Sequence, residues 1–180
     1  MAQIISFSDF MQQKDFFVEE AKKGKIFIYP TDTIYGIGAV ANEENILKIS
    51  QIKKREIKKL ISIIVPDFNY SSLVEGCKKY HISQATLQEQ LTKYHGVTWI
   101  FSENEPGMRI LKHDFQQFIK ALNLPFLTTS VNISGNTPAT SIDTVEKTIF
   151  EQVDYCIDAW ECKGRPSVLI NFLTWEIIER

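Results

Sequence analysis

Short apolar runs, several of which end in hydroxyl side chains, limit most strongly how this chain can fold. KIFIY at 25–29 stops at Pro30, LISIIV occupies 60–65, and PFLTTS at 125–130 ends in two threonines and a serine. Apolar runs of about 4–8 residues are typical of buried strands. Segments whose apolar residues recur at helical spacing lie between the early runs, whereas strand-like runs cluster late in the chain. The sequence therefore predicts an α/β fold with a mixed sheet and helices packed on it.

Apolar spacing and capping residues predict the individual elements. Ser8, Ser83 and Asp114 are expected to begin helices as N-caps, and Gly24 is expected to end the first helix. That helix should bury Phe10, Phe17, Val18 and Ala21. Helices are predicted over 8–23, 43–54, 71–80, 83–93, 114–122 and 143–149. Strands are predicted over 25–29, 60–65, 97–101, 107–111, 125–130, 153–157, 167–172 and 175–179. We expect one domain over residues 1–180.

Composition limits the compartment and the partners. The net charge of −2 gives no overall basic field, so any phosphate binding must come from a local patch. The three cysteines form no CxxC pair, which argues against a disulfide framework or a zinc site and fits a reducing compartment. We find no signal peptide and no apolar run long enough to cross a bilayer. We therefore expect a cytoplasmic protein without membrane contact.

Four polar segments are candidates for ligand binding: PTDTIYG (30–36), KKREIKK (53–59), TTSVNISGNTPAT (128–140) and KGRPSVLIN (163–171). Each alone has a structural explanation, because Ser, Thr, Asn and Gly form turns and a basic run after a helix is commonly a solvated face. Together they fit a crevice where loops at strand ends converge. Hydroxyls position oxygens, and Lys and Arg neutralise phosphate. The set predicts a phosphorylated ligand, and no Walker A or G-x-G-x-x-G motif narrows its identity.

These motifs, in this order, resemble the YrdC/TsaC-type threonylcarbamoyl-AMP synthase family. The matching segments are YPTDTIYGIGAVA, IKKR, KKLISIIV, TTSVNISGNTPAT and GRPSVLIN, and the resemblance covers roughly residues 8–180. The length is similar to the short, single-domain form, without the additional C-terminal domain of the longer form. The resemblance implies a YrdC-like fold, in which a twisted mixed sheet flanked by helices surrounds a large basic cavity.

The resemblance also implies an activity. A family member is a nucleotidyltransferase that makes threonylcarbamoyl-AMP and pyrophosphate from L-threonine, ATP and bicarbonate or CO2. The implied cofactor is Mg2+, carried by ATP. The product passes to a downstream threonylcarbamoyl transferase that modifies tRNA. The resemblance also implies that the protein itself contacts tRNA.

Residue roles follow from the family motifs. The K-x-R…S-x-N tetrad falls on the implied catalytic residues Lys53, Arg55, Ser130 and Asn132. The implied ATP-binding residues are Arg55, Lys59, Thr98, Asn132, Thr140 and Arg180. The implied L-threonine-binding residues are Thr33, Arg109, Ser130 and Ser167. No metal ligand is assigned, and Asp32 is either an outer-shell contact of Mg2+ or an Asx-type turn residue.

The chain departs from the family pattern mainly at prolines. Glu56, Leu60 and Leu111 stand where family members usually have proline, and His95-Gly96-Val97 replaces a Pro-Gly-Pro. Fewer prolines leave these loops less restricted. Glu56 matters most, because a carboxylate beside phosphate-binding bases either repels ATP or points to solvent and pairs with Lys53 or Lys59.

Two other functions remain open at this point. One is a non-catalytic RNA-binding module of the same fold, against which the negative net charge and the lack of an aromatic-interleaved basic surface argue. The other is a carbamoyl-phosphate-handling domain of the kind found in hydrogenase maturation. Such domains normally lie within much longer chains.

Overall fold

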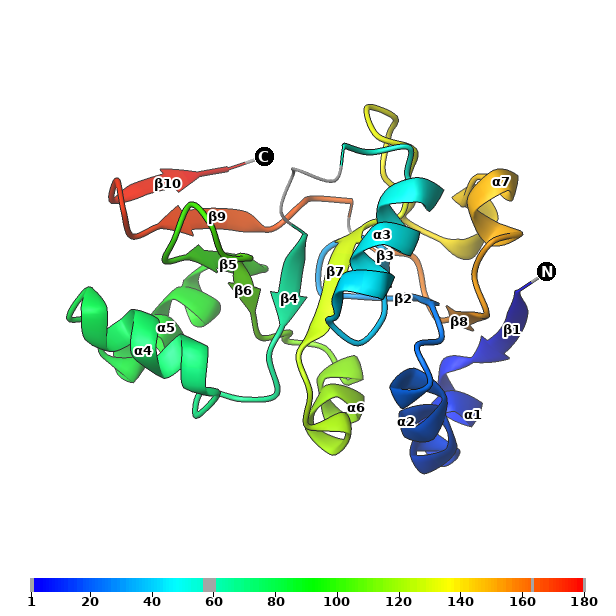
Figure 1. Cartoon of the computed structure of the whole chain (residues 1–180), viewed down its shortest axis with the longest axis horizontal. Coiled ribbons are helices and arrows are strands. Elements are labelled where there is room, and N and C mark those ends of the chain that lie inside the picture. Colours follow the sequence, from blue (N-terminus) through cyan, green and yellow to red (C-terminus); the bar gives the residue numbers. More distant parts are fainter. Residues whose placement is uncertain (1, 57–60, 163, 180) are drawn as a thin grey trace.

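A ten-stranded mixed sheet forms the centre of the protein (Figure 1). The computed structural model describes residues 2–56, 61–162 and 164–179. The strands are β1 Gln3–Ser6, β2 Phe27–Tyr29, β3 Gly36–Gly38, β4 Ser62–Ile64, β5 Val97–Ile100, β6 Met108–Arg109, β7 Phe126–Ser130, β8 Tyr155–Asp158, β9 Val168–Asn171 and β10 Glu176–Ile178. Their order across the sheet is β1-β8-β2-β3-β7-β4-β6-β5-β9-β10. Parallel pairs such as β5 with β9 stand beside antiparallel pairs such as β3 with β7, so the predicted mixed sheet is confirmed.

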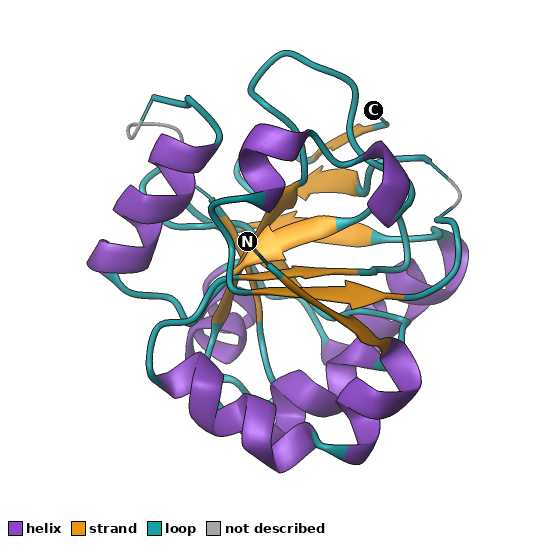
Figure 2. Cartoon of the chain, turned by 90° about the vertical axis from the view of Figure 1, so that its right-hand side faces the viewer, coloured by secondary structure: helices purple, strands orange, loops and turns teal. Residues whose placement is uncertain are grey.

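Helices pack on both faces of this sheet (Figure 2). They are α1 Phe7–Gln12, α2 Lys14–Lys22, α3 Glu43–Ile52, α4 Ser71–Lys79, α5 Gln84–Lys93, α6 Phe115–Leu122, the 3-10 helix η1 Ile142–Thr144 and α7 Lys147–Phe150. Helices α1, α2 and α6 contribute to one buried cluster, which is rich in aromatic rings. Helices α3, α4, α5 and α7 contribute to the other, which is mostly aliphatic. The two clusters are called the aromatic core and the aliphatic core below.

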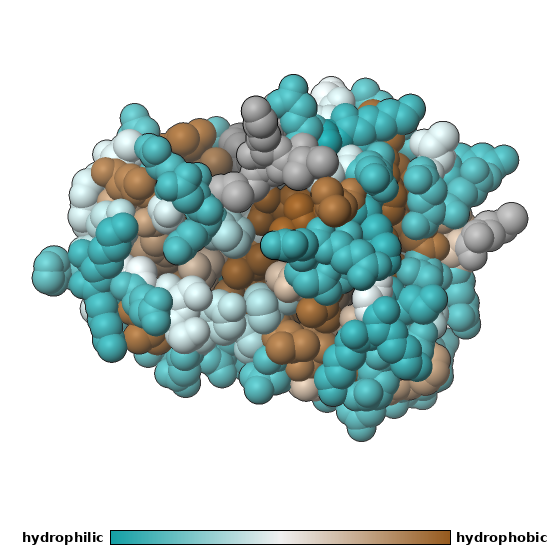
Figure 3. All heavy atoms as spheres, viewed as in Figure 1, coloured by the Kyte–Doolittle hydropathy of each residue, from teal (hydrophilic) through white to brown (hydrophobic). Residues whose placement is uncertain are grey.

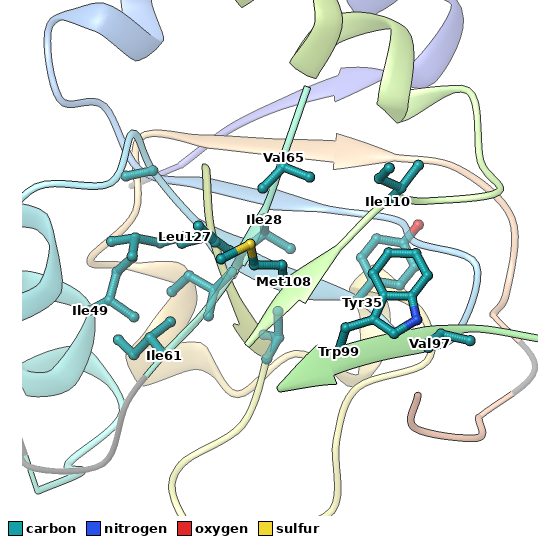
Figure 4. Close-up of a cluster of buried hydrophobic side chains, with 14 of the residues drawn as sticks. Ile28, Tyr35, Ile49, Ile61, Val65, Val97, Trp99, Met108, Ile110 and Leu127 are labelled. Atoms are coloured by element: carbon teal, nitrogen blue, oxygen red, sulfur yellow. The ribbon is translucent and has the colours of Figure 1, made fainter. Parts of the chain in front are cut away.

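Strand β2 is apolar at every position because both of its faces are covered. Phe27 and Tyr29 belong to the aromatic core, whereas Ile28 between them belongs to the aliphatic core (Figure 4). Successive side chains of a strand point to opposite faces of the sheet, and both faces here are covered. The Tyr29 ring stacks on Phe115 of α6 with ring centroids 4.2 Å apart, which ties this strand to the helix layer.

The first helical segment differs from the prediction in its start and its continuity. Ser6, and not Ser8, is the N-cap, and its hydroxyl accepts a hydrogen bond from the Asp9 amide at 3.1 Å. The prediction of Ser8 was wrong because the turn begins two residues earlier, directly after β1. The segment is also broken at Gln13, which separates α1 from α2. Gly24 follows the end of α2 with a φ of +80°, as expected of a residue that ends a helix.

Two further caps were predicted for later helices. Ser83 caps α5 as expected, since its hydroxyl accepts from the Thr86 amide at 3.1 Å. Asp114 occupies the N-cap position of α6 but makes no capping bond with its side chain. His113 Nδ1 instead accepts from the Phe115 amide at 3.0 Å.

Strands β1 and β3 were missed by the sequence analysis. Strand β3 has the sequence Gly-Ile-Gly, and glycine is depleted in strands because it has no side chain to pack. Its presence here has a steric cause. A Cβ at Gly38 would lie 1.9 Å from the carbonyl oxygen of Leu127, so only glycine allows β3 to approach β7 this closely. The antiparallel pair β2–β3 makes the polar segment 30–35 the loop that joins two strands of the sheet.

Most other elements lie where they were predicted, with ends that differ by at most two residues. The exception is 143–149, which forms η1 and the short helix α7. Residue 60 of the predicted strand 60–65 lies outside the described residues.

The face in Figure 3 is mostly hydrophilic, with hydrophobic side chains gathered near its middle. In the described part of the chain, no helix combines the length and the apolar character needed to span a bilayer.

Neighbouring phenylalanines on α2 test the packing of the aromatic core. Phe17 is 2% exposed and Phe16 is 53% exposed. We expect Phe17→Ala to lower the free energy of unfolding by about 3–5 kcal/mol, because it leaves a cavity among packed rings. The matched control Phe16→Ala should change it by no more than about 0.5 kcal/mol. Urea unfolding followed by circular dichroism measures both, and equal losses in the two variants would contradict this packing.

Candidate functional site

A cavity of about 320 Å³ lies along neighbouring strands in the middle of the sheet. Strands β3, β7, β4, β6 and β5 follow one another in the sheet, and each contributes to the wall. The loop between β2 and β3, the segment before β9, Arg55 after α3 and Pro138 after β7 also contribute to the wall. The serines and threonines in the wall are Thr31, Thr33, Ser62, Thr98, Thr128, Thr129, Ser130 and Ser167, and the cationic residues there are Arg55 and Arg109.

The structure brings most of the predicted site residues together in this cavity. Those in its wall are Thr33, Arg55, Thr98, Arg109, Ser130 and Ser167. Lys53, Asn132 and Thr140 are not among the described lining residues. Lys59 and Arg180 lie outside the described part of the chain.

Lys53 acts behind the wall of the cavity. It follows α3 as the C-cap residue and is 2% exposed. Its ammonium donates to the Asn132 carbonyl oxygen at 2.8 Å, to Asn132 Oδ1 at 3.1 Å, and to the Ser130 carbonyl oxygen. Burial, followed by the nearby charge of Arg55, lowers the pKa of Lys53 to about 8. Lys53 therefore fastens the end of β7 to α3 and does not face the cavity.

The Ser-x-Asn segment is held by a second set of contacts. Ser130 Oγ donates to Asn132 Oδ1 at 2.5 Å, and Asn132 Nδ2 donates to the Asn136 carbonyl oxygen at 2.7 Å. Glu146 accepts from the Ile133 amide and from Asn136 Nδ2, each at 3.0 Å. The bond from the Ile133 amide is the main cause of the lowered pKa of Glu146. Sequence reasoning missed Glu146 because its spacing from the motif carries no signal of contact.

Arg55 enters the cavity from the segment after α3. Its amide donates to the Ser50 carbonyl oxygen at 2.9 Å, and Nη1 donates to Thr129 Oγ1 at 3.4 Å. Burial lowers the pKa of the Arg55 guanidinium. The neighbouring Glu56 is exposed, which fits the second of the two alternatives given for it, a carboxylate that points to solvent. Lys53 binds carbonyl oxygens, and Lys59 lies outside the described residues, so neither is assigned as its partner.

The loop between β2 and β3 is closed by its own hydroxyls. Thr31 Oγ1 donates to the Ile34 carbonyl oxygen at 2.7 Å, accepts from the Thr33 amide at 3.1 Å and lies 2.9 Å from Thr33 Oγ1. Thr33 is fully buried. Both oxygens of Asp32 are engaged, one by Arg109 and the other by the Lys112 amide. The carboxylate therefore contacts Arg109 and Lys112, and among the described residues it does not form the Asx-type turn that was one of the two roles suggested for Asp32.

Parallel pairing of β5 and β9 brings Thr98 and Ser167 side by side. Their hydroxyl oxygens are 2.8 Å apart, and both side chains are buried. The resemblance implied that Thr98 binds ATP and that Ser167 binds L-threonine. In the structure these two side chains contact each other. Thr140 lies outside the wall, where its carbonyl oxygen accepts from the Cys162 amide at 2.8 Å.

The segment 159–162 is fixed across the motif loop. Tyr35 is fully buried, and its hydroxyl accepts from the Ala159 amide at 3.0 Å. Burial raises the pKa of Tyr35 to about 12. Cys162 Sγ lies 3.6 Å from the Thr31 carbonyl oxygen. Cys77, Cys156 and Cys162 are all free thiols, as the spacing of the cysteines predicted.

The fold and the cavity define a class of protein in which the loops and strands of a mixed sheet enclose a pocket lined by arginines and hydroxyl side chains. Arginines supply planar donors to carboxylate or phosphate, and hydroxyls fix the orientation of oxygens. Among the described residues, no group of three or more His, Cys, Asp or Glu side chains is arranged to hold a metal ion.

Comparison with known proteins identifies the family. A model of the Sua5/YciO/YrdC family, described as "Telomere recombination", matches residues 19–180. The chain belongs to this family, and the YrdC-like fold that the motifs implied is confirmed.

Three similar proteins illustrate the match. A protein of Methanocaldococcus jannaschii, named "Putative threonylcarbamoyl-AMP synthase", is 36% identical over 173 residues, covering 91% of this chain and 82% of that protein. The "Threonylcarbamoyl-AMP synthase" of Blochmanniella floridana is 27% identical over 179 residues, covering 90% and 93% respectively. The structure of P. abyssi Sua5 complexed with L-threonine matches with a TM-score of 0.75 at 20% identity, which shows a shared fold. That match covers 99% of this chain and 56% of the Sua5 chain.

The variant Lys53→Met tests the environment of the buried ammonium. Lysine in the unfolded chain titrates near its ordinary pKa of 10.5, whereas folding lowers the pKa of Lys53 to about 8. Between these values the unfolded state binds more protons, so the free energy of unfolding of the wild type should rise with pH relative to the variant. We expect a relative gain of up to about 3 kcal/mol across this range, measured by urea unfolding.

The exposed neighbour supplies the control for this measurement. Lys54→Met should show the same pH dependence of stability as the wild type, because Lys54 is exposed. If the wild type instead loses stability relative to Lys53→Met as the pH rises, the carbonyl contacts outweigh the cost of burying the charge.

Proposed function

We propose that this chain is a threonylcarbamoyl-AMP synthase, which forms threonylcarbamoyl-AMP and pyrophosphate from L-threonine, ATP and bicarbonate or CO2. The two curated relatives described above carry this name. The observation that carries the proposal is the meeting of Arg55, Arg109 and the hydroxyls of distant segments in one cavity. One arginine suits a phosphate and the other suits a carboxylate, which matches a reaction between a nucleotide and an amino acid.

The reaction has two covalent steps. The amino nitrogen of threonine forms a bond to the carbon of CO2 and loses a proton, which gives N-carboxy-threonine. A carbamate oxygen then bonds to the α-phosphorus of ATP while the bond from that phosphorus to the bridging oxygen breaks, and pyrophosphate leaves. Such a substitution depends mainly on positioning and on stabilisation of the phosphate charge.

We assign each residue a role from its position in or behind the cavity. Arg55 and Ser130 stabilise the phosphate and carbamate oxygens, and Arg109 with Thr33 holds the carboxylate end of threonine. Thr98 and Ser167, whose hydroxyls touch, line the same cavity. Lys53 and Asn132 act by holding the end of β7, as their contacts indicate. For Thr140, Lys59 and Arg180, the assignment to ATP rests on the resemblance.

Mg2+ is proposed as the ion that accompanies ATP. The described residues that line the cavity include hydroxyls but no carboxylate. Mg2+ prefers phosphate oxygens and water to a cage made only of protein ligands. The hydroxyl-rich wall therefore fits an ion held by the phosphates of the nucleotide, with the charge of those phosphates reduced when it is bound.

The product requires a consumer. Threonylcarbamoyl-AMP is a reactive mixed anhydride, so we propose a downstream threonylcarbamoyl transferase that acts on tRNA. The free thiols fit the reducing conditions of the cytoplasm, where we place the reaction.

Pyrophosphate release tests this function. The protein is incubated with ATP, Mg2+, bicarbonate and L-threonine, and matched reactions omit one component at a time. We expect release only when threonine and bicarbonate are both present. Release without threonine, or none from folded protein, would refute the proposal. Tight, salt-sensitive RNA binding without turnover would favour the non-catalytic RNA-binding module.

Arg55→Ala tests the assignment of the phosphate site. Arg55 lines the cavity, whereas its neighbour Lys54 is exposed. We expect Arg55→Ala to lower kcat/KM for ATP by at least about tenfold, because it removes a planar cationic donor from the phosphate. The control Lys54→Gln should remain within about twofold of the wild type. Pyrophosphate release measures both rates, and equal losses would show that overall charge, and not the position of Arg55, matters.

A further inference from the structure

Both carboxylate oxygens of Asp32 accept hydrogen bonds from groups outside the motif loop. Oδ1 accepts from Arg109 Nη2 at 2.8 Å, and Oδ2 accepts from the Lys112 amide at 3.1 Å. The side chains of Asp32 and Arg109 are 5% and 9% exposed. Charge-assisted bonds of this length in a buried setting fix both partners in one geometry.

Asp32 lies behind Arg109 as seen from the cavity. Arg109 lines the main cavity, whereas Asp32 is not among the described lining residues. Asp32 lines a separate cavity of about 300 Å³ together with His95 and Lys112. A ligand in the main cavity therefore meets the guanidinium of Arg109, and the Asp32 carboxylate contacts that guanidinium from the other side.

The guanidinium keeps donors that the described protein does not use. Nη2 donates to Asp32 and lies 3.4 Å from Thr33 Oγ1. The buried Nε has no hydrogen-bond partner in the described part of the chain. A buried donor without an acceptor is costly, and a ligand carboxylate is the group whose geometry best matches an arginine.

The backbone of Gly96 lies against Thr33, Arg109 and Asp32. A Cβ at this position would lie 2.5 Å from Thr33 Cγ2, 3.3 Å from Arg109 Nη2 and 3.4 Å from Asp32 Oδ1. The three side chains thus converge below the bare backbone of Gly96. A side chain at position 96 would clash with Thr33 and crowd Arg109 and Asp32, so glycine here leaves the Asp32–Arg109 contact undisturbed.

We propose that Asp32 is a positioning residue for amino-acid recognition. It holds Arg109 in one orientation at the cavity wall, where the guanidinium binds the α-carboxylate of the substrate. This inference rests on the proposed function, because it concerns the amino-acid end of that site. A simple electrostatic view predicts the opposite result, since removal of a negative charge near the site should tighten the binding of a carboxylate.

The test compares L-threonine with L-threonine amide, which lacks the carboxylate charge. Isothermal titration calorimetry gives the dissociation constants of both ligands for the wild type and for Asp32→Asn. We expect Asp32→Asn to weaken L-threonine binding by at least about tenfold. Binding of the amide should change by less than about twofold. Equal losses for both ligands, or tighter binding of L-threonine, would overturn the proposal.

Two further variants complete the experiment. Asp67 is exposed and is not among the described residues that line the cavity, so Asp67→Asn should leave both dissociation constants unchanged. In an Arg109→Gln background, Asp32→Asn should cause no additional loss of L-threonine binding, because the residue acts through Arg109. This double variant removes both buried charges and leaves neither unpaired. It can therefore be measured even if Asp32→Asn alone does not fold. An additional loss in that background would contradict the proposal.

Failure of this inference is distinct from failure of the proposed function. A wild type that neither binds L-threonine nor releases pyrophosphate with it refutes the function. A wild type that does both, with Asp32→Asn affecting threonine and its amide equally, refutes only the role of Asp32.

Discussion

The contact between the Lys53 ammonium and the carbonyl oxygens of Ser130 and Asn132 is the interaction on which the site depends. It joins the end of α3 to the end of β7, two segments separated by 77 and 79 positions in the chain. Arg55 follows Lys53 by two residues, so the same contact sets where its guanidinium enters the cavity. Glu146 holds the far side of the Ser-x-Asn segment, and the wall is therefore braced from both directions.

The remaining walls follow from the sheet. Both faces are covered by helices, and a central strand such as β2 is apolar at every position. Strands β5 and β7 carry the hydroxyls of Thr98, Thr128, Thr129 and Ser130 where they meet the cavity. Glycines allow the backbones at 38 and 96 to come close to their neighbours. The buried ion pair of Asp32 and Arg109 is costly to form, and in the proposed site it fixes the arginine that would bind the substrate carboxylate.

The sequence predicted the mixed sheet, most element ends and the segments that meet in the cavity, because strand length, caps and clustered hydroxyls are local signals. Strand β3 was missed since its glycines are explained only by the approach of β7, which is a tertiary contact. For the same reason the motif lysine was expected to contact the ligand, although burial directs its ammonium to backbone carbonyls. Asp32 and Glu146 acquire their roles from partners 77 and 13 positions away, and no local pattern encodes such contacts.

A structure with bound L-threonine and a non-reactive ATP analogue tests the central claim most directly, namely that one cavity holds amino acid and nucleotide together. The account predicts the threonine carboxylate on Arg109 and the α-phosphate beside Arg55 and Ser130, with Lys53 still bonded to the end of β7. Either ligand bound outside this cavity, or Lys53 released from β7 to contact phosphate, would contradict it.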